Sequence, residues 1–400
     1  MSDFIKNPHD RLNALSDFGR SFVKGEDGRI LIEKYQSEIG TVTPHETMYV
    51  LDSLILEGFT IEHMRSYTGK IINVFFKSLH EWNWEKPGKD HFLHYLMLEN
   101  REAEKIIKKL RIVIREFFHG ANPDMPVLLE SFRQLISKLG EYELHYIKKE
   151  IILFPYIEKT FPQYRCLQLM WSFHDDFRRS IRKLESLLQL ELPDKDSVSK
   201  ELGKLFFVVL PIIFREEQIV FPVALGALPD HAWQDMLNQS AGTGWCYIEP
   251  PSEIASSLKP MYSSSLIDLK SGSLGAEQII LLLNNLPVDL TYVDENDEVR
   301  YFSSGSHRIF PRSNAIIGRK VQNCHPPASM HIVNEIIDSF RKGIKDQAEF
   351  WIKMKDRFIH IRYFALRNEK SEYRGVIEVS QDVTSIRSLE GERRLLEWEK

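Results

Sequence analysis

Histidines and cysteines are the residues of this chain whose chemistry stands out. Its 400 residues include fourteen histidines but only three cysteines, Cys166, Cys246 and Cys324. The cysteines are widely separated and odd in number, which leaves neither a disulfide framework nor a zinc site of paired cysteines. Neutral imidazole, by contrast, is the commonest metal ligand and a common proton carrier. The composition therefore points to metal or proton chemistry based on histidine.

An internal repeat indicates where some of these histidines belong. The segment HYIKKEIILFPYI at 145–157 aligns without gaps on IIFREEQIVFPVA at 212–224. The identical pairs are Glu150 with Glu217, Ile152 with Ile219, Phe154 with Phe221, and Pro155 with Pro222. We infer two helical hairpins related by a pseudo-two-fold axis, each beginning with a helix that carries a histidine. His94 and His174 are expected to occupy comparable places in the two hairpins.

Helical periodicity defines the part of the chain that holds these residues. Between residues 88 and 240, apolar residues recur at spacings of three and four, and loops near 120–126, 162 and 192–196 interrupt the pattern. Four helices with three connections predict an antiparallel four-helix bundle. Residues 1–85 have the same helical pattern, and a Pro-Gly break separates the two regions. We expect a helical N-terminal unit followed by the bundle.

The period changes after the bundle. Residues 241–274 are rich in Ser, Gly and Pro and are expected to form a linker. Residues 275–386 read as two short strands, helices and three further strands, which predicts an α+β domain with one antiparallel sheet. The charged residues 387–400 are expected to form a C-terminal helix. The predicted fold class is a multidomain, mainly α-helical chain that ends in an α+β domain.

Five motifs carry a resemblance to a known family: KLRI through HYIKKEIILFPYIEK at 109–159, MWSFHDD at 170–176, IFREEQIVFP at 213–222, LPVDLTYVDENDEVRYFS at 286–303 and IIGRKVQNCHPP at 316–327. Over nearly its full length, the chain resembles bacterial proteins in which a domain of unknown function 438 precedes a hemerythrin-like (HHE cation-binding) domain and a PAS domain. Hemerythrin-like bundles hold non-haem iron through a histidine from one helix of each hairpin and a His-x-x-x-Glu from the other. The resemblance implies such a site here.

Helix geometry tests which residues could form that site. Positions i and i+4 lie only about 40° apart around a helix, whereas i+5 lies about 140° away. His145 is followed at i+4 by Lys149 in place of a carboxylate, and Glu150 stands at i+5. In the second hairpin, Glu216 stands at the carboxylate position, but Ile212 replaces the histidine four residues before it. The expected metal ligands that remain are His94, His145, His174 and Glu216.

Two interpretations of this reduced ligand set remain open. The set could hold one ion, with non-haem iron or another divalent metal as the expected cofactor, but it is too small for two irons. Alternatively, the Lys149 ammonium reaches Glu216 and takes the place of a metal in a buried ion pair. Histidines in helical bundles are also often core groups satisfied by hydrogen bonds.

The C-terminal domain contains a second candidate site at Cys324 and His325. The prolines that follow, Pro326 and Pro327, hold the chain extended, so that a thiolate or imidazole could face a ligand such as haem iron. His331, at the start of the next helix, is a further cofactor-binding candidate. The alternative is a buried Cys324 that acts as a small hydrophobe. The PAS resemblance implies sensing of a small molecule or gas, and a homodimer formed through this domain and the C-terminal helix.

Charge and patterning narrow the function classes. The net charge of −5 gives no reason to expect binding to nucleic acid or attraction to an acidic membrane. No stretch reaches the roughly 20 apolar residues of a membrane span, and the N-terminal residues lack a secretory pattern, so a cytoplasmic location is expected. The sequence contains no phosphate loop, paired catalytic carboxylates or nucleophile elbow, and it does not predict an enzyme.

Three functions follow from these observations. The leading hypothesis is a cytoplasmic sensor or regulator of redox state, oxygen or nitric oxide, with a metal-binding bundle and a PAS signalling domain. The second is a metal-free helical interaction scaffold for a PAS ligand sensor, suggested by Lys149 and Ile212. The third is a di-iron oxidase or an iron donor for cluster repair, which the missing ligands disfavour.

Overall fold

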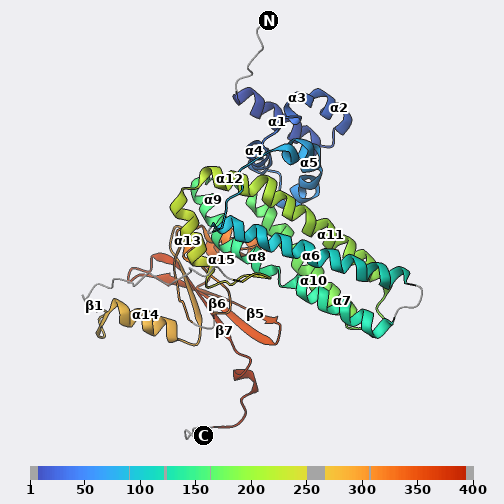
Figure 1. Cartoon of the computed structure of the whole chain (residues 1–400). Helices are drawn as coiled ribbons and strands as arrows, with labels where there is room; N and C mark the ends of the chain where they lie inside the picture. The colour runs from blue at the N-terminus through green and yellow to red at the C-terminus, as the bar shows by residue number, and fades with distance from the viewer. Residues whose placement is uncertain are drawn as a thin grey trace. The chain divides into compact units, whose positions relative to one another are not determined.

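The computed structural model describes residues 8–89, 91–120, 124–162, 164–249, 266–305 and 308–392 (Figure 1). The chain forms two compact units, one made by the helices before residue 256 and one made mainly by residues 257–400. None of the helices in the described ranges combines the length and the apolar composition that a membrane span requires.

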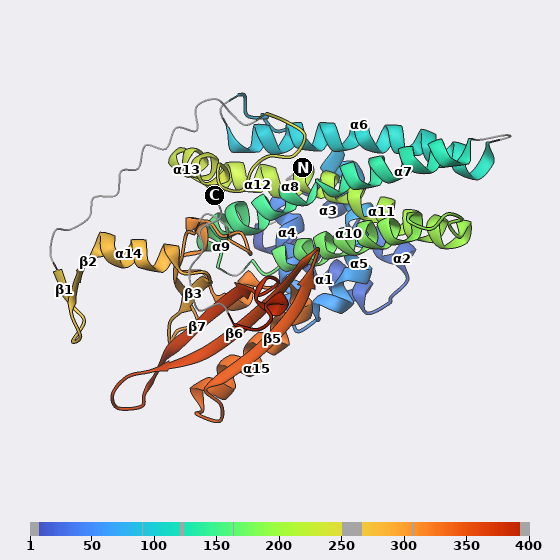
Figure 2. The ribbon, with the colours of Figure 1, turned by 90° about the horizontal axis from the view of Figure 1, so that it is seen from below.

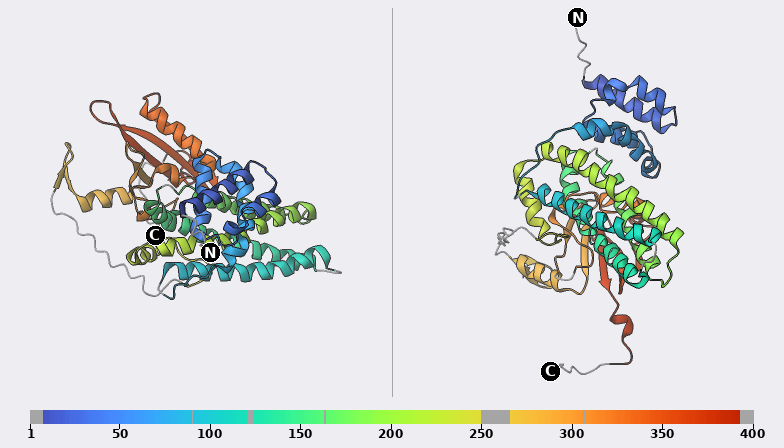
Figure 3. Two further views of the ribbon diagram at one scale, coloured as in Figure 1. Left: turned by 90° about the horizontal axis from the view of Figure 1, so that it is seen from above. Right: turned by 45° about the vertical axis from the view of Figure 1, so that its right-hand side comes forward.

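The first unit begins with a group of short and medium-length helices. They are α1 (Pro8–Val23), α2 (Gly28–Lys34), α3 (Gln36–Ile39), α4 (Pro44–Leu56) and α5 (Ile61–Glu81). Thr43 and Glu46 form a capping box that fixes the start of α4. Phe18 of α1 and Phe75 of α5 are fully buried, with ring centroids 5.7 Å apart. Helices α4 and α5 pack on the helices that follow in the same unit (Figure 3).

Four long helices in the described part of the first unit form a bundle (Figure 2). They are α6 (Phe92–His119), α7 (Met125–Gly140), α10 (Leu167–Leu188) and α11 (Lys195–Arg215). Shorter helices continue the second helix of each hairpin: α8 (Glu143–Lys148), α9 (Phe154–Thr160), α12 (Phe221–Ala227) and α13 (Asp230–Ser240). In α10, Phe177, Ile181, Leu184 and Leu188 are buried at spacings of three and four, so one face of this helix supplies the core.

A π-helical turn occurs at equivalent positions of both hairpins, as η1 (Lys149–Leu153) and η2 (Glu216–Val220). In each turn a phenylalanine amide bonds the carbonyl five residues earlier, from Phe154 to Lys149 and from Phe221 to Glu216. A proline follows each phenylalanine, and a proline has no amide hydrogen for the regular helical bond. The matching turns confirm the internal repeat predicted from the sequence.

The second unit contains, in its described part, a five-stranded antiparallel sheet with strand order β4-β3-β7-β6-β5. The strands are β3 (Asp289–Val293), β4 (Val299–Phe302), β5 (Gln347–Met354), β6 (Arg357–Arg367) and β7 (Tyr373–Asp382). Helix α14 (Ala276–Asn285) precedes the sheet, and α15 (Met330–Arg341) lies across one face of it (Figure 2). Gly375 has φ 122°, and a Cβ there would overlap the Val293 carbonyl oxygen, so this bend in β7 requires glycine.

The predicted fold class is confirmed, because a mainly helical chain ends in an α+β domain with two strands, helices and three further strands in the expected order. The expected linker differs in part, since β1 (Leu266–Asp268) and β2 (Ser273–Gly275) form a hairpin, while residues 250–265 lie outside the described residues. In the expected C-terminal helix, Ile386–Ser388 form a single 3-10 turn and residues 393–400 lie outside the described residues. Gly391, with φ 64°, departs from the helical path there.

Candidate functional site

Buried charged and polar side chains meet inside the bundle, and we refer to them as the polar centre. Helix α6 contributes Glu99 and Asn100, and α10 contributes His174. Helix α8 contributes His145 and Lys148, and the π turns η1 and η2 contribute Lys149, Glu150, Glu216 and Glu217. All of these side chains are buried. An unpaired charge is very costly to bury, so the chemistry of the polar centre depends on how these groups pair.

His145 lies between two carboxylates. Its Nδ1 is 2.8 Å from Oε2 of Glu99, and its Nε2 is 3.0 Å from Oε2 of Glu216. Burial disfavours the charge of Glu216, but the Lys149 and His145 cations outweigh burial and lower the pKa of Glu216 to about 2. The pKa of Glu99 is lowered in the same way, against its burial, by His145 and Lys148. Each ring nitrogen of His145 is therefore engaged by a carboxylate, one from each hairpin.

The ammonium of Lys149 occupies the middle of the polar centre. It donates to Oε1 of Glu216 and to Nε2 of His174, which is 3.1 Å away. It also lies 4.5 Å from the centroid of the Tyr146 ring. Burial lowers the pKa of Lys149, and the charge and hydrogen bond of Glu216 oppose that shift. Lys149 therefore joins the two hairpins through its charge, as the second interpretation of the sequence predicted.

His174 is neutral in this arrangement. Its Nδ1 donates to Oε1 of Glu150 over 2.7 Å, and Arg178 holds the other oxygen of Glu150 at 2.8 Å. Its Nε2 accepts the hydrogen bond from Lys149. Burial, together with the cations Lys149 and Arg178, keeps the pKa of His174 well below its ordinary value. His174 thus has the tautomer that a metal ligand needs, but its lone pair faces an ammonium.

The residues of the polar centre do not fit a metal ion while Lys149 lies among them. Both ring nitrogens of His145 are engaged by carboxylates, and the lone pair of His174 is taken by Lys149. Both oxygens of Glu216 are also engaged, by Lys149 on one side and by His145 and Asn100 on the other. Within the described ranges, no group of three or more His, Cys, Asp or Glu side chains is arranged to hold a metal.

Three of the four predicted ligands come together here, namely His145, His174 and Glu216. His94 lies elsewhere, half-buried near the start of α6, with its ring centroid 5.4 Å from that of Tyr95. The expected equivalence of His94 and His174 is corrected by the repeated contacts of the two hairpins. Glu150 contacts His174, and its repeat partner Glu217 contacts Asn100 at 3.0 Å, so Asn100 is the counterpart of His174.

Sequence reasoning missed Glu99 and Asn100, although α6 contains a signal for them. Leu96, Asn100, Ala103 and Ile107 follow one face of this helix at spacings of three and four, and all four are buried. A polar residue in such an apolar row predicts a buried hydrogen-bonding role. That role is filled by the contacts of Asn100 with Glu216, Glu217 and Tyr142.

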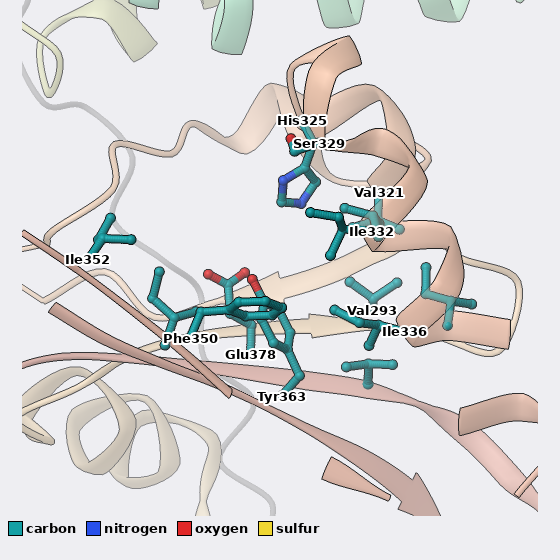
Figure 4. A pocket seen from close by; sticks show the side chains of 14 residues that line it. Val293, Val321, His325, Ser329, Ile332, Ile336, Phe350, Ile352, Tyr363 and Glu378 are labelled. Atoms are coloured by element: carbon teal, nitrogen blue, oxygen red, sulfur yellow. The ribbon is translucent and has the colours of Figure 1, made fainter. Parts of the chain in front are cut away.

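A cavity of about 240 Å³ lies between α15 and the sheet of the second unit (Figure 4). Its wall is mostly apolar and includes Val293, Ile332, Ile336, Phe350, Ile361 and Val376. Polar groups come from two sides, with His325 on the loop before α15 facing Glu378 and Tyr363 on the sheet (Figure 4). Burial lowers the pKa of His325, with Glu378 opposing the shift, and burial raises the pKa of Tyr363. At neutral pH both groups are therefore uncharged hydrogen-bonding partners.

The cofactor-binding candidates of this domain differ in position. His325 lines the cavity. Cys324 ends the short helix η4 (Val321–Cys324), where its thiol lies 3.7 Å from the Lys320 carbonyl oxygen. His331 is exposed on the first turn of α15 and is not among the cavity-lining residues. The structure therefore brings one of the three candidates to the cavity.

The bundle and the sheet with its cavity define a class of protein that joins a helical bundle to an α+β domain with an apolar cavity. Residues 91–224 match the hemerythrin HHE cation binding domain, and residues 279–384 match the PAS domain. The chain therefore carries a hemerythrin-like domain and a PAS domain, as the resemblance implied. The first domain suggests cation binding, and the second suggests sensing or signalling.

Solved structures resemble parts of the chain. A C-terminal domain from Streptococcus mutans is 28% identical, and the match covers 32% of this chain and 98% of that one with a TM-score of 0.30. A PAS domain from Colwellia psychrerythraea is 19% identical, with 27% and 97% covered and a TM-score of 0.23. A sensory box sensor histidine kinase from Vibrio cholerae is 17% identical, with 26% and 89% covered and a TM-score of 0.21. Comparison with curated proteins found no match.

Proposed function

We propose that this protein is a sensor whose PAS cavity binds a small, mainly apolar molecule, while the hemerythrin-like bundle serves as a metal-free helical scaffold. The observation that supports this most directly is the cavity of about 240 Å³, with its apolar wall and its few converging polar groups. Cavities of this character are the usual sites of small-molecule binding. Pairing of two copies through the PAS domain and a cytoplasmic location stay predictions.

The lining of the cavity defines the chemistry of the ligand. Apolar side chains favour an apolar body, and the Glu378 carboxylate favours a hydroxyl or another hydrogen-bond donor at one end. Pockets for drug-sized ligands begin at roughly 300 Å³, so the cavity suits a molecule smaller than a haem. The sequence-based expectation of haem near His325 is therefore the less favoured one.

Binding of 2-naphthol tests this proposal on the full chain. We expect saturable binding by calorimetry, at least tenfold tighter than that of 2-methylnaphthalene, which has a similar shape but no hydroxyl. Ile336→Trp narrows the cavity and should abolish binding. Asn334→Trp places the same ring on the exposed face of α15 and should leave binding intact. Equal binding to both variants, or no binding to the unaltered protein, would contradict the proposal.

A second candidate is an iron-binding bundle that senses redox state, oxygen or nitric oxide, and the match of residues 91–224 to a cation-binding domain favours it. It requires Lys149 to withdraw from His174 and Glu216, since those groups now bond its ammonium. A di-iron oxidase or an iron donor also needs a carboxylate at position 149, and we propose neither.

Metal analysis distinguishes the two roles of the bundle. We expect the full-length protein, purified from iron-supplemented cells, to contain less than about 0.1 iron per chain. The variant Lys149→Glu places a carboxylate four residues after His145 and should raise the iron content towards one. Lys105→Glu makes the same charge change on the exposed side of α6 and, as the control, should leave the iron content unchanged. Stoichiometric iron in the unaltered protein, lost in a His145→Ala/His174→Ala variant, would establish the second candidate instead.

A further inference from the structure

Arg215, the last residue of α11, is a buried cation with no acidic partner among the described residues. Only 7% of it is exposed, and its Nε is buried without a hydrogen-bond partner among the described residues. Its guanidinium lies 4.2 Å above the centroid of the Phe173 ring. Burial alone lowers the pKa of Arg215 to about 10, with no acidic neighbour opposing the shift. The side chain is therefore charged at neutral pH in a place where charge is costly.

In the first hairpin the cation equivalent to Arg215 is paired with a carboxylate, which Arg215 lacks. In the repeat Arg215 corresponds to Lys148, whose ammonium lies 2.8 Å from Oε1 of Glu99 and 2.9 Å from the Gly244 carbonyl oxygen. Because Asn100 is the counterpart of His174, Glu99 is the counterpart of Phe173. The second hairpin thus has a phenyl ring where the first has the carboxylate that neutralises its cation.

A small cavity adjoins the Arg215 side chain. Its volume is about 30 Å³, and its wall comes from α4, α5, the start of α10 and η2. The lining includes Met48, Thr68, Cys166, Phe173 and Arg215. The Thr68 hydroxyl already donates to the Met64 carbonyl over 2.7 Å, and burial raises the pKa of Cys166, so its thiol stays neutral. The wall supplies apolar surface and one positive charge, but no negative charge.

We propose that Arg215 binds a small, weakly hydrated monovalent anion, of which nitrate is the model, in this cavity. A water-sized group needs roughly 10–15 Å³ by this measure, so the cavity admits an anion of a few atoms. The planar fork of a guanidinium matches a planar oxyanion. Strongly hydrated anions such as sulfate and phosphate are disfavoured, because the apolar wall cannot replace their water. The bound anion supplies the charge that Glu99 supplies to Lys148.

An anion in this cavity would lie at the contact between the N-terminal helices and the bundle. The cavity lies where α4 and α5 of the N-terminal group meet α10 and η2 of the bundle. Nη2 of Arg215 also reaches α5, 3.5 Å from the place of a Cβ on Gly69. An anion held there stabilises the contact between the N-terminal helices and the bundle.

Thermal unfolding of the full chain in sodium nitrate tests the proposal, with sodium fluoride at the same ionic strength as the reference. We expect nitrate to raise the Tm by about 4 °C at tenfold saturation, following mass action. Arg215→Met should lose this shift. Arg111→Met is the matched control, because Arg111 lies over the Phe206 ring at 5.8 Å but is exposed and free to be hydrated. It should keep the nitrate shift in full.

A second variant supplies the missing charge from within the chain. Phe173→Glu copies the arrangement of Glu99 and Lys148, and it should abolish the nitrate shift while circular dichroism shows an intact fold. Calorimetry with sodium nitrate should give one saturable site in the unaltered protein and none in Arg215→Met. A nitrate shift that persists in Arg215→Met, or no nitrate-specific shift in the unaltered protein up to about 100 mM, would overturn the proposal.

Discussion

The two hairpins of the bundle share a backbone plan but differ in charge. Lys149 of the first hairpin corresponds to Glu216 of the second, and these two side chains pair with each other. One position earlier both hairpins carry a cation, yet Lys148 meets a carboxylate and Arg215 meets a phenyl ring. When one copy of a repeated position carries a lysine and the other a carboxylate, the two side chains can therefore pair with each other inside the bundle. The surrounding π turns stay the same.

The largest expected effect comes from removing the shared anion of this arrangement. Glu216→Gln leaves the Lys149 ammonium buried without its carboxylate and takes the charged acceptor from His145. Breaking a buried pair by removing one partner typically costs about 3–5 kcal/mol, and we expect a loss of that size in the free energy of unfolding. Urea denaturation followed by circular dichroism measures it.

A surface pair provides the control for that loss. Glu102 lies 2.6 Å from Lys105 on the exposed side of α6, and Glu102→Gln should change stability by less than about 1 kcal/mol. If Glu216→Gln cost no more than Glu102→Gln, the polar centre would not depend on its internal ion pairs.

The next largest effect distinguishes the two cations that the repeat makes equivalent. Lys148→Met removes one partner of Glu99, which keeps His145 and the Cys246 amide, so we expect a loss of about 2 kcal/mol. Arg215→Met removes a cation that has no counter-ion in the described part of the chain and, in fluoride buffer, should leave stability unchanged or raise it. Both variants are compared by urea denaturation. Equal losses would show that the hairpins do not differ in the way their contacts suggest.

The smallest expected effect concerns pH. The pKa of His174 is far below its ordinary value of 6.5 in the folded chain, so below pH 6.5 the unfolded chain binds a proton that the folded chain does not. Stability is therefore complete above pH 6.5 and falls as the pH drops, by at most about 1.4 kcal/mol per pH unit from this residue. His174→Asn should flatten the dependence between pH 6.5 and 5. His94→Asn, which changes a histidine outside the polar centre, should leave it in place.

Much of the fold was predictable because it rests on periodic features of the sequence. The spacing of apolar residues predicts the helices of the bundle, and alternating residues around an Asn-Asp turn predict β3 and β4. The gapless repeat likewise predicts the paired hairpins, which the matching η1 and η2 confirm. Such features depend on local sequence, so they can be recognised without knowledge of the tertiary contacts.

The polar centre was predictable only in part, because convergence depends on how each helix is rotated and on which residues are equivalent in space. The sequence order suggested His94 as the partner of His174, whereas the contacts of Glu150 and Glu217 identify Asn100. The π turns also change which residues face inward, and periodicity based on 3.6 residues per turn does not reveal them. The pairing of Lys149 with Glu216 was accessible from the sequence, since both lie at the same position of the repeat.

The Lys149 ammonium is tied to the chain by covalent bonds, and this sets it apart from any cation that arrives from solution. A bound ion leaves when its concentration falls or a chelator competes for it, and the fold that depends on it loses stability by mass action. The Lys149 ammonium cannot dissociate from the chain, so it has no binding equilibrium of this kind. The metal-free bundle that we propose would therefore have the same stability whether the cell is starved of metal or supplied with it in excess.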